Sequence, residues 1–195
     1  MDAIITTGQA ERNGNPKAYS TGKFDRRHLD VWTSGPLQGA RRIRGVPELT
    51  LTVRSSAAAA TLVAYLFDVG ADDTARIITH EPLTLPELSP GENRRATWKL
   101  RAAGYDLAPD HRLMLVVNSK DRLYSDASTE HSITTITSGD DTAAHLVLPL
   151  GCPSSTAPGQ ARARWQVRVH RVRSLLVATA RVRPDGEKPT ARSSE

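Results

Sequence analysis

The chain has 195 residues, 38% of them hydrophobic and 24% charged, with a mean hydropathy of −0.40; these values are typical of one globular domain with polar loops or tails. No apolar run approaches the length of a membrane span, and the N-terminus has no pattern of a secretion signal, so we expect a cytoplasmic protein. The single cysteine, Cys152, excludes an internal disulfide and an all-cysteine zinc site.

The net charge of +5 would fit a nucleic-acid partner if the charge were spread over the fold. Residues 152–195, however, hold nine Lys and Arg against three Asp and Glu, a balance of +6. The remaining 17 basic and 18 acidic residues leave a balance of −1 for residues 1–151. We therefore expect a nearly neutral folded part that binds neither nucleic acid nor membrane.

The first half of the chain passes from a polar leader to strand patterns. Residues 1–27 show neither a helical nor a strand period, which predicts a flexible leader. HLDVW at 28–32 and PELTLTVRS at 47–55 alternate apolar with polar residues, as half-buried strands do. ATLVAYLFDVG at 60–70 is apolar at successive positions, which predicts a strand covered on both faces.

The second half continues in the same way up to residue 151. The further predicted strands are RIITHEPLTL (76–85), ATWKLRAAGYDL (96–107), RLMLVVNS (112–119), HSITTIT (131–137) and AHLVLPLG (144–151). Seven or eight short strands separated by Pro, Gly and Asp turns, without an amphipathic helix, predict an all-β fold. We expect an antiparallel sandwich or jelly roll over residues 28–151.

The segment 152–195 is basic and differs in pattern. From Arg162 it alternates Val with Arg or His, then holds a short apolar patch and ends in a polar tail. This pattern fits an edge strand whose arginines face water, followed by disorder, and disorder of the whole segment stays an alternative.

Motifs of catalysis and metal binding are absent from the sequence. There is no Gly-x-Ser-x-Gly, HExxH, Walker loop or GxGxxG, and the six histidines lack metal-ligand spacing. Asp72 and Asp73 lack the DxDxDG spacing of a calcium loop and are interpreted as solvated turn residues. Ser125, Ser128 and His131 lie close together in sequence, but such proximity is frequent by chance. We expect no catalytic residue, metal or cofactor.

The stretch GYDLAPDHRLMLVVNSKDRLY, residues 104–124, joins His111 and Arg112 to an apolar strand. One interpretation makes His111 a general base oriented by Asp106 or Asp121. The other, which we favour, has Arg112 pair with Asp106 or Asp121 to fix a loop, while His111 binds loop carbonyls. Together with Asp68, which ends the preceding apolar strand, these are the predicted loop-fixing residues.

Several of these segments, in their order along the chain, resemble a known family. They are VWTSGPL (31–37), RIRGVPELTLTV (42–53), ATLVAYLFDVG, RIITHEPLTL, SPGE (89–92) and YDLAPDHRLMLVVNSKD (105–121). In these segments the chain resembles the C-terminal domain of the X-Pro dipeptidyl-peptidase and cocaine-esterase-like serine hydrolases. The resemblance covers roughly residues 28–151.

The resemblance implies a galactose-binding-like jelly roll that packs beside an α/β-hydrolase domain, where the family carries its Ser-Asp-His triad. It also implies that Val31 and Trp32, on the first strand, face the partner or wall its substrate pocket, with Trp32 on an exposed apolar patch. Asp110 stands where the family commonly has glycine, which bears on the turn geometry because glycine adopts positive φ freely.

Two functions from different classes follow. The first is a non-catalytic module of an X-Pro dipeptidyl-peptidase or acyl-esterase, inactive by itself, which shapes the pocket of an α/β-hydrolase partner and stabilises it. The alternative is a free-standing carbohydrate-binding or adhesion module, which needs an aromatic platform. An aromatic content of only 5% disfavours the alternative.

Overall fold

The structure is a computed structural model that describes residues 18–24, 29–119, 121, 124, 127–128, 132–137 and 143–151, together with the backbone of residues 162–172 and 175–183. Most of the predicted leader, Cys152, His131, Ser125 and the predicted polar end of the chain lie outside the described residues. The strands are β1 (Ala18–Ser20), β2 (Leu29–Thr33), β3 (Arg41–Gly45), β4 (Glu48–Ser55), β5 (Ala60–Val69), β6 (Thr74–Leu85), β7 (Asn93–Lys99), β8 (Ala103–Leu107), β9 (Arg112–Asn118), β10 (Thr134–Thr137), β11 (Ala144–Gly151), β12 (Arg162–Val172) and β13 (Leu175–Arg183). A single turn of 3-10 helix, η2 (Thr21–Lys23), is the helical element of this described part.

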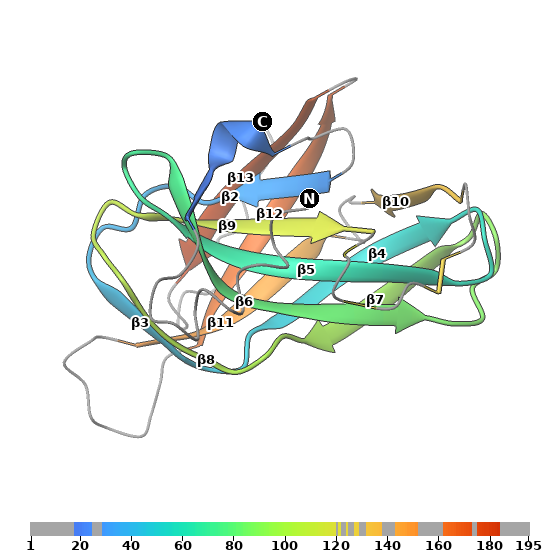
Figure 1. The fold of residues 1–195 in the computed structure, drawn as a ribbon, viewed down its shortest axis with the longest axis horizontal. Coiled ribbons are helices and arrows are strands. Elements are labelled where there is room, and N and C mark those ends of the chain that lie inside the picture. Colours follow the sequence, from blue (N-terminus) through green and yellow to red (C-terminus); the bar gives the residue numbers. More distant parts are fainter. Residues whose placement is uncertain are drawn as a thin grey trace, which may run out of the picture.

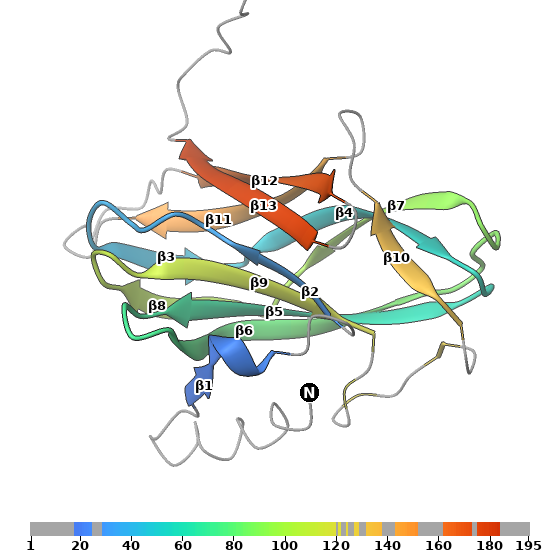
Figure 2. The same ribbon diagram turned by 90° about the horizontal axis from the view of Figure 1, so that it is seen from above.

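The strands form two sheets in which every described pairing is antiparallel. One sheet has the order β1-β6-β5-β9-β2, and the other is eight-stranded along the path β10-β4-β11-β12-β13, with β7 beside β4 and β3-β8 beside the end of β11. Figures 1 and 2 show the two sheets as stacked layers. The expected all-β sandwich of the jelly-roll type is confirmed. Among the described residues, no helix is long and apolar enough to cross a membrane.

The strand β5 shows why its sequence is apolar at successive positions. It lies between β6 and β9 in the middle of the five-stranded sheet, and all its residues are buried. Leu62, Ala64 and Leu66 face the second sheet, whereas Tyr65 and Phe67 belong to a cluster on the opposite face. The prediction of a strand covered on both faces is confirmed.

The core between the sheets consists of apolar side chains that alternate along each strand. Its buried members are Trp32, Leu37, Ile43, Leu49, Leu51, Val53, Leu62, Ala64, Leu66, Ala96, Trp98, Leu100, Leu107, Leu113, Leu115, Val117, Ala144, Leu146, Leu148 and Leu150. We call this set the inter-sheet core. Burial of this much apolar surface is the main favourable contribution to folding.

A second buried cluster covers the other face of the five-stranded sheet. It contains Tyr19, Phe24, Leu29, Val31, Val63, Tyr65, Phe67, Val69, Ala75, Ile77, Met114 and Val116, with half-buried Tyr124 against it. We call this set the outer cluster. Figure 2 shows β1 and η2 on this side of the sheet, so the segment that contains Tyr19 and Phe24 shields the face from solvent.

The sequence patterns did not predict β1, β3 or β13, which lies where disorder was expected after a single edge strand, and they joined two other strands. β1 has only three residues, and three of the five residues of β3 are arginine, so no alternation of apolar and polar residues marks them. The predicted strand over 96–107 is two strands, because β7 pairs with β4 while β8 pairs with β3. The chain changes partner at Leu100, whose N–H donates to the carbonyl of Pro47 at 2.9 Å.

The basic segment after residue 151 contributes two strands. β12 pairs with β11 along Ala144 to Pro149, and β13 pairs with β12 to form the edge of the eight-stranded sheet. β13 also contacts β2, the edge strand of the other sheet. The β12-β13 hairpin therefore closes one side of the sandwich.

Candidate functional site

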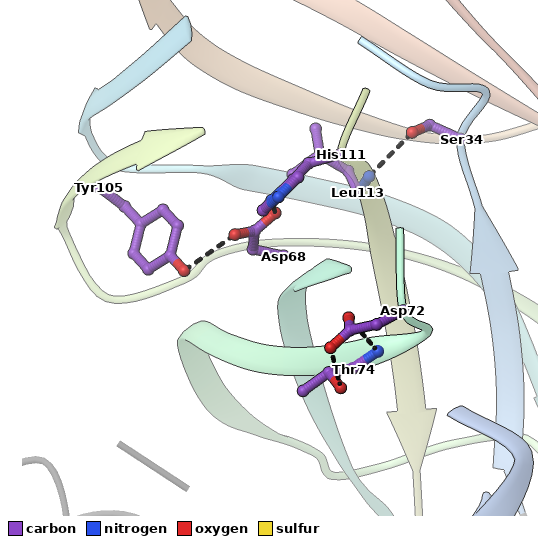
Figure 3. Close-up of polar contacts among 7 residues, drawn as sticks. All are labelled: Ser34, Asp68, Asp72, Thr74, Tyr105, His111 and Leu113. Carbon is purple, nitrogen blue, oxygen red and sulfur yellow. Dashed lines mark hydrogen bonds and ion pairs between the residues drawn. The ribbon is translucent and has the colours of Figure 1, made fainter. Parts of the chain in front are cut away.

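A hydrogen-bonded polar site lies at one end of the sandwich and joins residues of β5, of β8 and of the turn before β9 (Figure 3). Asp68 is 5% exposed near the end of β5. One of its oxygens accepts a hydrogen bond from His111 Nδ1 at 2.8 Å, and the other accepts one from the Tyr105 hydroxyl at 3.0 Å. Burial, followed by the nearby Asp68 carboxylate, raises the pKa of Tyr105. Both carboxylate oxygens are thus satisfied by donors from β8 and from the residue before β9.

The turn before β9 fixes the position of His111. Asp110 has φ 64°, in the left-handed region. Its N–H donates to the carbonyl of Leu37 at 2.9 Å, and the N–H of Leu37 donates to the carbonyl of His111 at the same distance. The aspartate therefore adopts the conformation for which glycine is the usual residue, and the turn is retained because a short polar side chain tolerates that region.

The same turn holds the segment that follows β2. Ser34 Oγ accepts a hydrogen bond from the N–H of Leu113 at 2.8 Å and donates to the carbonyl of Gly35 at 2.7 Å. Figure 3 shows the Ser34–Leu113 bond beside the Asp68–His111 pair. The fixed loop therefore supports an exposed tip that contains Gly35 and Pro36.

The predicted partners of Arg112 are wrong. Arg112 pairs with Asp73 in the β5-β6 turn, and Asp106 instead binds Arg42 through two bonds of 2.5 and 2.6 Å. The reason is register: Asp106 faces Arg42 directly across the β3-β8 pair, and β3 was not predicted. The Arg42 guanidinium lowers the pKa of Asp106. His111 likewise uses Asp68 as its carboxylate partner, not Asp106, Asp121 or a loop carbonyl.

The aspartates of the β5-β6 turn bind their own chain. Asp72 accepts hydrogen bonds from the N–H and the hydroxyl of Thr74 at 3.1 and 2.8 Å (Figure 3), and these bonds lower its pKa. A Cβ on Gly70 would lie 2.8 Å from Asp72 Oδ1, so a larger residue there would displace the Asp72 side chain. In the described part of the chain no three His, Cys, Asp or Glu side chains are grouped so as to hold a metal.

Asp121 lies in a different place from the other predicted loop residues. It is 6% exposed and accepts a hydrogen bond from the Tyr65 hydroxyl at 2.5 Å, beside the outer cluster. Burial and this bond raise the pKa of Tyr65. Nearby, the Tyr124 hydroxyl and His80 Nδ1 share a bond of 2.6 Å, and burial lowers the pKa of His80. This cluster was missed because Tyr65 and His80 stand within apolar strand patterns.

Val31 and Trp32 are not on the surface of the described structure. Val31 is 5% exposed in the outer cluster, and Trp32 is 1% exposed in the inter-sheet core, where its Nε1 has no hydrogen-bond partner. The expected exposed patch at Trp32 is therefore wrong, because Trp32 points between the sheets. The sequence did not single out Asp30, which stands two residues before Trp32 on the same face of β2. Burial raises the pKa of Asp30 to about 6.

The arrangement has the orientation part of a catalytic apparatus but not its nucleophile. A carboxylate only accepts hydrogen bonds, so the proton between Asp68 and His111 is on Nδ1. Within the described residues, no hydroxyl or thiol is hydrogen-bonded to His111 Nε2. This nitrogen faces Gly70, and a Cβ added to that glycine would lie 3.8 Å from it. Ser128 Oγ accepts a bond from the N–H of Thr61 at 2.9 Å. The described hydrogen bonds of His111 are those of a loop held to β5.

Comparison with known proteins agrees with the architecture. The sequence model of the X-Pro dipeptidyl-peptidase C-terminal non-catalytic domain matches residues 6–156. Among solved structures, an α-amino acid ester hydrolase aligns with a TM-score of 0.57 and 15% identity over 77% of this chain and 27% of its own length. A CocE/NonD family hydrolase from Staphylococcus aureus aligns with a TM-score of 0.55 and 13% identity over 69% of this chain and 32% of its own.

These alignments show the fold, and the chain spans only about a third or less of each of those hydrolases. No curated protein sequence matches it. The family match includes residues 6–27, which the predicted leader covered, and it ends before β12. Because it extends over more than half of the 195 residues, the chain belongs to the family of X-Pro dipeptidyl-peptidase C-terminal non-catalytic domains.

Proposed function

We propose that this chain is a non-catalytic β-sandwich module that docks on a catalytic α/β-hydrolase domain of the dipeptidyl-peptidase or acyl-esterase type. In this role it stabilises that domain and helps to shape its substrate pocket. The observation that carries the proposal is the family match over residues 6–156, to a domain described as non-catalytic. The absence of a nucleophile beside His111 in the described residues supports it.

Hydrogen bonds hold the loop between Ser34 and Leu37 in place, so that it can serve as a docking surface. Asp68 fixes His111, and the His111 carbonyl and the Asp110 N–H hold Leu37. Ser34 is held by Leu113, so the exposed residues between Ser34 and Leu37 have little freedom. A loop fixed in this way loses little conformational entropy when it contacts a partner.

Val31 and Trp32 then have an indirect role. Since both are buried, they would shape a partner's pocket only by setting the course of β2 and the start of the loop. Trp32 is therefore a positioning residue in this proposal. The exposed Gly35 and Pro36 replace it as the partner-facing candidates.

The carbohydrate-binding alternative gains no support from the described residues. It needs exposed aromatic side chains, and Trp32 and Trp98 are both buried in the inter-sheet core.

The proposal is tested by hydrolysis of a chromogenic X-Pro dipeptide and a short acyl ester. The purified chain should turn over neither substrate, and adding the α/β-hydrolase region encoded with it or beside it should give activity above that of the hydrolase alone. A His111→Ala variant should lower this enhancement, whereas Arg76→Ala, on the exposed part of β6, should not. Turnover by the chain alone would contradict the proposal.

A further inference from the structure

The outer face of the eight-stranded sheet is rich in basic side chains. On β3, β4 and β7 every second residue points into the inter-sheet core, as Ile43, Leu51 and Trp98 do. The residues between them face away from the core, because successive side chains of a strand alternate. The basic residues on this side, which we call the basic face, are Arg42, Arg44, Arg54, Arg95 and Lys99.

Side-chain contacts confirm that these strands share the face. The hydroxyls of Thr50 and Thr97 share a hydrogen bond of 2.8 Å between β4 and β7. Arg95 crosses β4, with Nη1 at 3.5 Å from Thr52 Oγ1 and Nη2 at 3.4 Å from the carbonyl of Ala143. The guanidinium therefore lies over the sheet rather than beyond its edge.

The carboxylates on this face are too few to neutralise it. Asp106 pairs with Arg42, and Glu48 stands opposite Lys99 in the register. Arg44, Arg54 and Arg95 are exposed and form no ion pair with a described carboxylate. Among the described residues, these three guanidinium groups thus have no carboxylate partner, and Arg95 donates only to neutral oxygens.

The backbone register places further arginine positions opposite the outward positions of β11. In β11 the outward positions are His145, Val147 and Pro149, since their neighbours belong to the inter-sheet core. Residues that pair across antiparallel strands occupy the same face. Positions 162 and 164 pair with Pro149 and Val147, position 183 pairs with 164, and all three are arginine.

We propose that the basic face binds a carboxylate-rich protein surface. Guanidinium groups recognise carboxylates in bidentate geometry, and the interspersed Asp106 and Glu48 would meet basic residues of a protein of mixed charge. Sheet surfaces that bind single-stranded nucleic acid present aromatic rings for base stacking, and the described part of this face has none. The inference does not depend on the proposed hydrolase partner.

The test uses a fluorescein-labelled peptide of about a dozen glutamates, titrated with the purified chain by fluorescence anisotropy. Binding should weaken from low to physiological salt, because salt screens exposed charges. Arg44→Glu/Arg95→Glu should weaken it about tenfold, which corresponds to about 1.4 kcal/mol. The matched control, Lys23→Glu/Arg76→Glu, reverses two exposed charges away from the basic face, one in η2 and one in β6, and should change affinity less than about twofold. Thermal unfolding should show that both variants fold.

Three outcomes would overturn the inference. One is no binding of the glutamate peptide by the wild-type chain. Another is equal loss of affinity in both double variants, which would mean that net charge rather than the basic face decides. The third is tighter binding of a double-stranded oligonucleotide of equal charge that is lost in Arg44→Glu/Arg95→Glu, which would make the face a nucleic-acid surface.

Discussion

The two faces of the five-stranded sheet are both buried, but they differ in chemistry. The inner face contributes to the inter-sheet core mainly through Leu, Ala and Val side chains of β5 and β9. The outer face combines aromatic rings with polar pairs, such as Tyr65 with Asp121 and His80 with Tyr124. Stability on the inner face should therefore depend on packing volume, whereas the outer face should also depend on hydrogen bonds.

The largest effect is expected from a cavity on the inner face. Leu66 is fully buried in the inter-sheet core, and Leu66→Ala should lower the free energy of unfolding by about 2–5 kcal/mol in urea titrations, from lost burial and the residual cavity. The exposed control Lys99→Ala should stay within about 0.5 kcal/mol of wild type. A loss below about 1 kcal/mol for Leu66→Ala would mean that the sheets are not closely packed there.

Asp30 breaks the pattern of the inner face and gives a pH signature. Its folded pKa of about 6 exceeds the unfolded value of 3.8, so the folded state binds more protons and loses stability as pH rises from about 4 to about 6. Asp30→Asn should remove this loss, which is at most about 3 kcal/mol. The lowered pKa of His80 acts in the opposite direction, but it is common to both proteins and cancels in their difference.

The measurement is urea unfolding of both proteins at about pH 4.5 and about pH 7.5. The gain from Asp30→Asn should be larger at the higher pH. Asp72→Asn should have nearly the same effect at these two pH values, because the pKa of Asp72 is lowered and the stability it gives is lost only as pH falls below the unfolded value of 3.8. An equal effect of Asp30→Asn at both pH values would exclude the burial of a charged Asp30.

The outer face is tested by removing a single hydroxyl. Tyr65→Phe keeps the buried ring but leaves Asp121 without the donor at 2.5 Å, and it should cost about 1–3 kcal/mol. Tyr124→Phe, at a half-buried ring, should cost less. Equal and negligible losses would show that the outer face, like the inner one, depends on packing alone.

The smallest effect concerns the turn beside the loop site. Asp110→Ala should cost about 1 kcal/mol, because alanine is less tolerant of φ 64° than aspartate. Asp110→Gly should be within about 0.5 kcal/mol of wild type, since the relief of strain offsets the larger entropy of the unfolded chain. The stability of the two variants can be compared by differential scanning calorimetry. A higher unfolding temperature for Asp110→Ala than for Asp110→Gly would contradict this order.

The sequence predicted the fold well where side chains alternate. The faces of β4 and β9 follow directly from Leu49, Leu51 and Val53 and from Leu113, Leu115 and Val117, since the strand period is two. β5 was recognised because apolar residues occupy both of its faces. These features depend on local pattern, which a single sequence contains.

The sequence predicted several residues of the candidate site but not which of them pair with one another. Asp68, Asp106, His111 and Arg112 do form hydrogen bonds or ion pairs at one end of the sandwich, but their partners depend on strand register. Asp106 could not be matched with Arg42 without β3, which has no strand pattern. The burial of Trp32 likewise depends on the second sheet and not on its neighbours in sequence.

The central claim is that this chain is a non-catalytic module that binds an α/β-hydrolase domain. Sedimentation velocity of the chain with the hydrolase region encoded with it or beside it tests this most directly. We predict a complex of the two, with a higher midpoint of thermal unfolding for the hydrolase when the chain is bound. No complex, together with ester or X-Pro hydrolysis by the chain alone, would contradict the account.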